Sequence, residues 1–113
     1  MKVKDIVDKF GLKVFSGDKG LNREVIGGYT SDLLSDVMGF AKEGEIWVSL
    51  QTHKNIMAVA GLKDLAAIVL VKGLMPEEDA VAVSNEEGIP ILGTSENCFE
   101  FTGALYTYLK NNG

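Results

Sequence analysis

Three short polar segments hold the side chains of this sequence that are best suited to binding or chemistry. Each follows an apolar stretch and precedes a helical pattern, so each forms a strand-to-helix corner. Such a corner collects free backbone N–H groups, the positive end of a helix dipole and small hydroxyls, which suits an anionic or polar ligand. The side chains at these corners are Thr30, Ser31, Asp32, Gln51, Thr52, His53, Thr94 and Ser95. We therefore predict a ligand-binding site made from these residues.

Two adjacent glycines, Gly27 and Gly28, precede the first corner inside a strand expected over residues 23–30. Paired glycines in a strand mark either a β-bulge or a place where another group approaches the backbone closely. The bulge is the more ordinary interpretation, whereas a bound phosphate or a second backbone segment would explain the close approach. Both glycines are included among the candidate ligand-binding residues.

Catalytic chemistry has little support in this sequence. His53 is the only histidine, and it stands beside Thr52, the expected N-cap of the next helix, where the helix dipole disfavours a protonated imidazole. A general base needs a nucleophile within reach, and no such pairing is visible. We therefore expect no catalytic residue, and interpret His53 as a ligand or interface contact or as an ordinary surface histidine. Cys98, the only cysteine, is expected to be a packed thiol rather than a redox group.

Metal and cofactor sites are not expected either. Ser31, Asp32, Ser35 and Asp36 offer two carboxylates that suit Mg²⁺, but capping of the following helix explains Ser31 and Asp32 more simply. One histidine and one distant cysteine do not make a zinc site. The sequence holds neither the P-loop motif nor a dinucleotide-binding fingerprint.

Composition limits the class of protein. The chain has 113 residues, 46% apolar and 24% charged, which predicts one globular domain over residues 1–113. The net charge is −5 and the 11 Lys and Arg are scattered, which argues against nucleic acid as a partner. The longest apolar run, residues 65–71, is far below the ~20 residues of a membrane span, and no signal-peptide pattern opens the chain. We expect a cytoplasmic protein without a membrane partner.

Hydrophobic periodicity predicts helices and strands in alternation. Helices are expected over residues 3–10, from about residue 33 to 41, after Thr52, from Pro76 to about 85, and after Ser95, the last one burying Phe99, Leu105, Tyr106 and Leu109 or their neighbours. Strands are expected over residues 12–15, 23–30, 46–50, 66–71 and 89–92. Residues 66–71 are apolar without alternation, which is typical of a central parallel strand covered on both faces.

This alternation predicts an α/β fold, a three-layer α/β/α sandwich with a mostly parallel sheet of about five strands. Ligands of such sheets bind beyond the carboxyl ends of the strands, at the point where strand order reverses. All three polar corners follow strands, so we expect them to share one edge of the sheet.

The sequence also resembles a known family, the DRTGG domain, which is related in fold to the N-terminal domain of HPr kinase/phosphorylase. The resemblance covers nearly the whole chain and rests on the opening helix, residues 21–29, residues 31–36 and residues 50–53. Asn22 and Arg23 stand where the naming motif has Asp-Arg, and Gly27 and Gly28 lie further along than in that motif. Members occur alone or as regulatory parts of larger proteins, for example beside CBS domains. The likeness implies a non-catalytic regulatory or scaffolding module.

The preferred hypothesis is a regulatory, ligand-sensing module that binds a small anionic metabolite or nucleotide, or a partner protein, at the strand-end edge. The favoured residues are Ser31, Asp32, Gln51, Thr52 and His53. One alternative is a pure interaction or assembly subunit without a small-molecule ligand, and the weakest is an enzyme of unknown reaction. A homodimer is expected, with one or two aromatic residues from Phe15, Tyr29, Phe40 and Trp47 as a possible dimer face.

Overall fold

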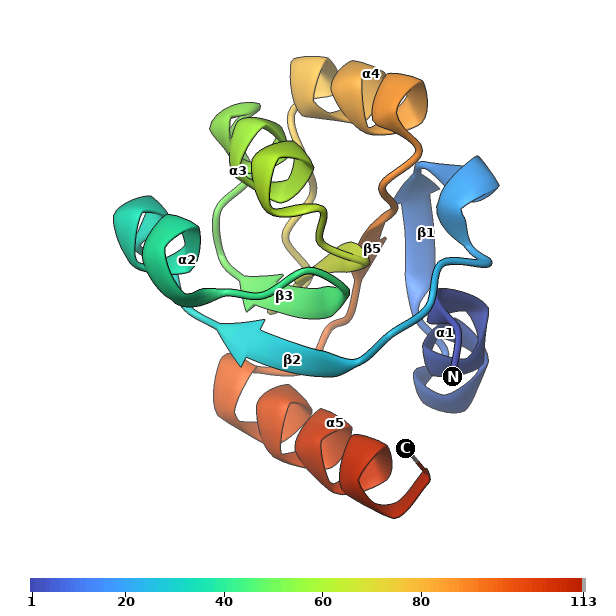
Figure 1. Ribbon diagram of the computed structural model, residues 1–113. Helices are drawn as coiled ribbons and strands as arrows, with labels where there is room; N and C mark the ends of the chain where they lie inside the picture. The colour runs from blue at the N-terminus through green and yellow to red at the C-terminus, as the bar shows by residue number, and fades with distance from the viewer. Residues whose placement is uncertain (113) are drawn as a thin grey trace.

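The computed structural model describes residues 1–112 (Figure 1). Its helices are α1 (Val3–Phe10), α2 (Leu34–Phe40), α3 (Asn55–Lys63), α4 (Glu78–Glu87) and α5 (Cys98–Asn112), with a short 3-10 turn, η1 (Asp18–Gly20). Its strands are β1 (Lys13–Ser16), β2 (Gly27–Thr30), β3 (Glu45–Ser49), β4 (Ala67–Leu70) and β5 (Ile91–Gly93). Every predicted helix and strand is present, with ends that differ by a few residues.

The strands form one five-stranded sheet in the order β1-β5-β4-β3-β2. The neighbours from β2 to β5 are parallel, and β1 pairs antiparallel with β5 at one edge. β4 lies in the middle and is buried along its whole length, as its unbroken apolar sequence predicts. The four parallel strands follow one another in chain order without a reversal. The expected reversal point is therefore absent from the parallel part of this sheet.

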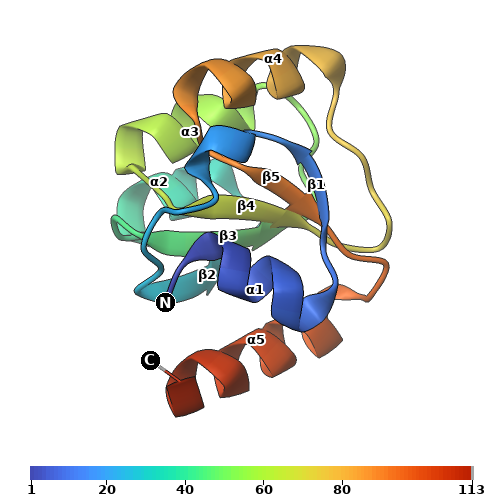
Figure 2. The same cartoon turned by 90° about the vertical axis from the view of Figure 1, so that its right-hand side faces the viewer.

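Helices cover both faces of the sheet, which confirms the three-layer α/β sandwich. α2, α3 and α4 lie on one face, and α1 and α5 lie side by side on the other (Figures 1 and 2). The α2–α4 face buries Trp47 and Ile68, whereas the α1–α5 face buries Ile46 and Val69. Adjacent residues of β3 and β4 thus point into different layers, because side chains alternate along a strand.

The apolar side of α5 differs in part from the prediction. Leu105 is buried and Leu109 packs partly against the core, but Phe99 and Tyr106 are 86% and 63% exposed. Phe101 takes the core position instead, and its ring packs edge-on against Phe10 of α1, with the centroids 5.4 Å apart. Aromatic residues lie on several sides of this helix, so periodicity alone did not identify the buried ones.

The two glycines of β2 do not form a bulge. Gly27 pairs with Glu45 and Gly28 with Ile46, in a register that continues unbroken to the end of the strand. β2 also begins only at Gly27, later than predicted. Nor does either glycine mark an unusually close approach. A Cβ atom on Gly28 would lie 3.5 Å from Leu105 Cδ2 of α5, an ordinary van der Waals contact, and one on Gly27 would meet only the Glu45 side chain.

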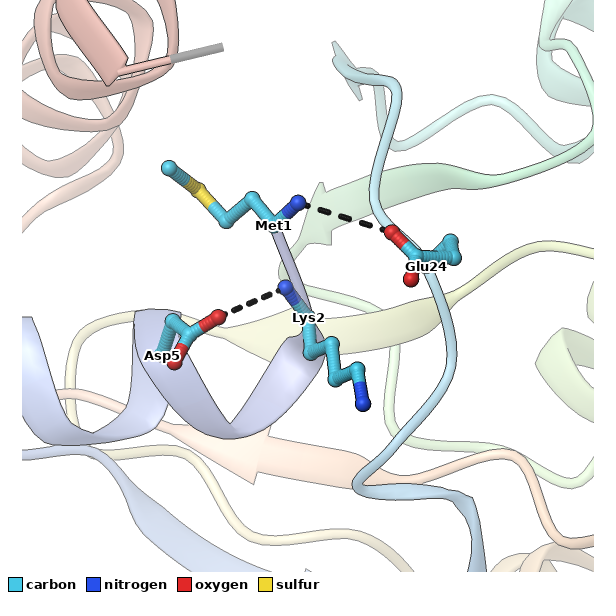
Figure 3. A network of polar contacts seen from close by, with 4 residues as sticks. All are labelled: Met1, Lys2, Asp5 and Glu24. Atoms are coloured by element: carbon cyan, nitrogen blue, oxygen red, sulfur yellow. Dashed lines mark hydrogen bonds and ion pairs between the residues drawn. The ribbon is translucent and has the colours of Figure 1, made fainter.

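The first residues of the chain are held against the segment that precedes β2 (Figure 3). The Lys2 backbone N–H donates to Asp5 Oδ2 at 2.8 Å, and the Met1 ammonium group lies 3.4 Å from Glu24 Oε2. Val25 N–H donates to the Met1 carbonyl at 2.8 Å. These contacts fix the start of α1 beside the strand segment that leads to β2.

Arg23, one of the residues that carry the family resemblance, joins the same region to two helix ends. Its Nε donates to the Gly88 carbonyl at 3.0 Å, and its Nη1 lies 3.1 Å from Asp64 Oδ1. Gly88 and Asp64 are the left-handed residues that end α4 and α3. Arg23 therefore has a structural role at the edge where the parallel strands begin.

Candidate functional site

The carboxyl ends of β2, β3, β4 and β5 lie along one edge of the sheet, which we call the rim. The three predicted polar corners follow β2, β3 and β5, so all three lie on the rim. The end of β4 separates the second corner from the third. The rim therefore has a β2–β3 half, with residues 31–33 and 50–53, and a β4–β5 half, with residues 71–75 and 94–96.

In the β2–β3 half, Asp32 forms hydrogen bonds to the end of the neighbouring strand, β3. Its Oδ1 accepts hydrogen bonds from Ser49 Oγ at 2.9 Å and from the Leu50 backbone N–H at 2.7 Å. Gln51 Nε2 donates to the Asp32 carbonyl at 3.0 Å. The predicted capping of α2 by Ser31 and Asp32 is wrong, because its N-cap is Leu33, which makes no side-chain cap bond. The Asp32 carboxylate satisfies free donors of β3 instead.

We predict that Asp32→Ala lowers the free energy of unfolding by about 1–2 kcal/mol, since it removes two hydrogen bonds to a charged acceptor at an exposed position. Urea denaturation followed by circular dichroism measures the change. Glu43→Ala is the matched control, because it removes an exposed carboxylate that makes no hydrogen bond or ion pair among the described residues. A loss for Asp32→Ala no larger than for Glu43→Ala would contradict the strand-end role.

The remaining side chains of the first corner also make internal contacts. Ser31 Oγ accepts the Leu33 backbone N–H at 3.2 Å, and the Ser31 carbonyl accepts Trp47 Nε1–H at 2.7 Å. Thr30 Oγ1 lies 3.0 Å from Thr102 Oγ1 of α5. Close by, Tyr29 O–H donates to Asp36 Oδ2 at 2.9 Å, and this hydrogen bond to a carboxylate raises the pKa of the Tyr29 phenol.

At the second corner, His53 pairs with the helix on the far side of β4. Its Nδ1 lies 2.5 Å from Glu77 Oε2, and the Glu77 backbone N–H donates to the Thr52 carbonyl at 3.0 Å. Glu77 is the N-cap of α4, so this helix begins two residues later than predicted from Pro76. Thr52 does not cap α3, whose N-cap is Lys54. The side chains of His53 and Glu77 are 64% and 47% exposed, so the pair is a surface contact.

The β4–β5 half contains a depression of about 390 Å³, which we call the rim depression. Segments far apart in the sequence line it: the end of α1, the start of β1 and the loops that follow β4 and β5. The lining residues are Phe10, Gly11, Lys13, Phe15, Gly73, Leu74, Met75, Gly93, Thr94, Ser95 and Glu96. Of the predicted ligand-binding residues, Thr94 and Ser95 line this depression.

Gly93, which has no side chain, makes room for an aromatic ring in the rim depression. A Cβ atom on Gly93 would lie only 2.4 Å from Phe15 Cε2, so the Phe15 ring covers the Gly93 backbone. Lys13 Nζ lies 5.0 Å from the centre of the same ring. Thr94 Oγ1 accepts the Glu96 backbone N–H at 3.2 Å, and the Thr94 carbonyl accepts Gly73 N–H at 2.9 Å. The result is a mixed surface, with aromatic and apolar side chains beside hydroxyls, one ammonium group and the carboxylate of Glu96.

The structure thus divides the predicted site residues into separate groups. Ser31, Asp32 and Gln51 are joined by hydrogen bonds, Thr52 and His53 contact α4, and Thr94 and Ser95 line the rim depression. Gly27 and Gly28 lie at the other end of β2, away from the rim. The sequence reasoning missed Phe10, Lys13 and Phe15. Gly93, a glycine inside an apolar strand, is the signal that points to a close neighbour there.

The described part of the chain holds neither a metal-binding cluster nor a membrane-spanning helix. Among residues 1–112, no group of three or more His, Cys, Asp and Glu side chains is arranged to hold a metal ion. In the same part of the chain, every helix is too short or too polar to cross a bilayer. Cys98 is half-buried at the start of α5 and packs against the α1–α5 side of the core.

Comparison with known proteins supports the fold. No family model matches the sequence, and no curated protein matches it. Among solved structures, the chain is similar to the CBS and DRTGG domains of the regulatory region of a pyrophosphatase from Clostridium perfringens, in complex with its activator, diadenosine tetraphosphate. The sequences are 12% identical, the TM-score is 0.70, and the match covers 96% of this chain and 46% of that one.

The chain therefore spans just under half the length of that regulatory region. At 12% identity the likeness shows the fold, and it confirms the DRTGG-like fold that the sequence resemblance implies.

Proposed function

We propose that this chain, as one domain over residues 1–113, is a non-catalytic regulatory module that binds a small anionic metabolite or nucleotide in the rim depression. The observation that supports this most is that aromatic rings and a cationic side chain line the same depression. Aromatic rings of Phe10 and Phe15 offer contact to an apolar or planar part of a ligand, and Lys13 is the cationic residue of the described lining. Nucleotides and acyl-CoA compounds combine a ring system with phosphate groups and so fit this chemistry.

Further support comes from the rest of the rim. Asp32 and Gln51, favoured in the sequence, are engaged in holding strand ends. Among residues 1–112, the Ser95 hydroxyl and the Lys13 ammonium group make no hydrogen bond or ion pair, and Lys13 contacts only the face of the Phe15 ring. The neighbouring pyrophosphatase region was solved with a dinucleotide activator, which makes dinucleotides natural first probes.

The test is a thermal-shift screen of the chain against nucleotides, diadenosine tetraphosphate, acyl-CoA compounds and phosphosugars. A ligand at ~100 times its dissociation constant adds about 2.7 kcal/mol to the free energy of unfolding. For a chain of this size we expect the melting temperature to rise by about ten degrees. No shift with any compound would overturn the ligand-sensing proposal for these classes.

Matched variants locate the binding site of any hit. We expect Lys13→Ala and Ser95→Ala to abolish the shift, because both side chains line the rim depression. Asp32→Ala and His53→Ala, which change the β2–β3 half, should leave the shift intact once their own stability is subtracted. If Asp32→Ala and His53→Ala abolish the shift and the other two variants keep it, the ligand binds at the residues favoured by the sequence. A shift kept by all four variants would mean that the ligand binds away from the rim.

A further inference from the structure

The rim depression carries one cation and one anion that do not neutralise each other. The Lys13 ammonium group and the Glu96 carboxylate both line it, and neither makes an ion pair among residues 1–112. The carboxylate also accepts no hydrogen bond from residues 1–112, so its acceptor sites stay available to a ligand. This pair of charges fits a ligand that has a negative group at one place and N–H donors at another.

The backbone at Glu96 is fixed from two sides. Its N–H donates to Thr94 Oγ1 at 3.2 Å, and its carbonyl accepts the Lys72 N–H at 2.8 Å. Gly73 N–H donates to the Thr94 carbonyl at 2.9 Å, so the loops that follow β4 and β5 lie side by side (Figure 2). The Glu96 side chain therefore starts from a defined place on the lining, which lowers the ordering cost of binding.

The size of the rim depression limits the ligand to one ring system. Its volume of about 390 Å³ lies near the lower end of the range of ~300–1,000 Å³ that ligand pockets span. Phe10 and Phe15 supply the aromatic part of the lining, and Lys13 Nζ lies 5.0 Å from the centre of the Phe15 ring. A mononucleotide, with one base for the aromatic residues and one phosphate group for Lys13, fits this combination.

A carboxylate distinguishes the two purine bases, because an ionised carboxylate only accepts hydrogen bonds. Guanine offers two adjacent donors, N1–H and the N2 amino group, and a carboxylate accepts both at once. Adenine offers one donor, the N6 amino group, beside the acceptor N1, and that acceptor is repelled by a carboxylate oxygen. Glu96 is the only carboxylate of the described lining, so its chemistry favours guanine.

We infer that the rim depression binds a guanine mononucleotide, with Glu96 accepting the N1–H and N2–H donors of the base and Lys13 contacting the phosphate group. This inference rests on the proposed ligand-binding function of the rim depression and names the class of ligand. Ser95, whose hydroxyl makes no hydrogen bond among residues 1–112, offers a further contact to the ribose or the phosphate group.

Isothermal titration calorimetry of the chain with GMP and AMP tests the inference. We expect GMP to bind about tenfold more tightly than AMP, since Glu96 is exposed and a bidentate pair discriminates less there than in a buried site. Glu96→Gln should weaken GMP binding about tenfold. The same variant should bind AMP at least as well as the wild type does, because an amide donates to N1 and accepts from N6.

Glu100→Gln is the matched control. It removes one exposed carboxylate of α5 that does not line the rim depression, so it should keep the preference for GMP. Circular dichroism checks that both variants are folded. A loss of the preference in Glu96→Gln and Glu100→Gln alike would attribute it to net charge and would overturn the role of Glu96.

The remaining outcomes separate this inference from the proposed function. Equal affinities for GMP and AMP, or a preference that Glu96→Gln keeps, would overturn the guanine inference and leave ligand sensing in place. The same conclusion follows if acyl-CoA compounds or phosphosugars raise the melting temperature and neither nucleotide binds. If no compound of any class binds, the inference and the proposed function both fail.

Discussion

Trp47→Ala should lower the free energy of unfolding by about 3–5 kcal/mol, the largest loss that we expect from any single side chain of the sheet. Trp47 is completely buried in the α2–α4 side of the core. Its indole N–H also donates to the Ser31 carbonyl at 2.7 Å, so truncation leaves both a cavity and an unpaired acceptor at the rim. Such a loss is a large part of the total stability of a domain of this size.

Trp47→Phe separates the two contributions. The smaller ring keeps much of the packing but donates no hydrogen bond, so we expect a loss well below that of the alanine variant. Urea denaturation followed by far-ultraviolet circular dichroism suits both variants, since Trp47 is the only tryptophan and fluorescence is lost with it. Equal losses for the two variants would show that the hydrogen bond to Ser31, and not the packing, carries the effect.

Gly20→Ala is the second substitution with a large expected effect, a loss of about 3 kcal/mol. A Cβ atom on Gly20 would lie 2.0 Å from the Gly88 carbonyl oxygen, and backbone has to move to admit it. That carbonyl also accepts the hydrogen bond from Arg23 Nε, so the movement disturbs a second contact. The same denaturation experiment measures the loss.

Gly39→Ala is the matched control for Gly20→Ala. Gly39 lies in α2, and a Cβ atom there meets nothing within 4 Å, so the added methyl group should stabilise the helix by about 0.5 kcal/mol. Opposite signs for the two variants would attribute the loss at Gly20 to the contact with Gly88. A small effect at Gly20 would mean that the turn η1 and the end of α4 separate easily.

The order of helices and strands was predictable because each element carries its own local pattern. The apolar run of residues 66–71 gave the central strand, and the mixed stripe of residues 3–10 gave α1. The residues that cap α2 and α3 were predicted wrongly. Thr52 and Asp32 have the right side chains for caps, but hydrogen bonds across the sheet hold Asp32, and the chain turns into α3 at Lys54. In both cases, contacts between residues far apart in the sequence determine where the helix begins.

The candidate site was predictable in the same limited way. That the corners meet at one edge follows from parallel pairing, and Thr94 and Ser95 were named on that ground. The aromatic part of the rim depression was not foreseen, because Phe15 belongs to β1, whose antiparallel place beside β5 is set by a pairing that no local pattern encodes. The ligand itself stays a prediction, as do the favoured residues of the β2–β3 half.

The place of β1 in the sheet also has a consequence for biosynthesis. Lys13 pairs with Gly93, so one of the first strands to leave the ribosome finds its neighbour only when most of the chain has been made. Until then β4 lacks its β5 neighbour, and its open apolar edge is a template for pairing with other chains. Fragments that end before residue 91 should therefore aggregate, whereas the parallel units from β2 to β4 can begin to assemble as they emerge.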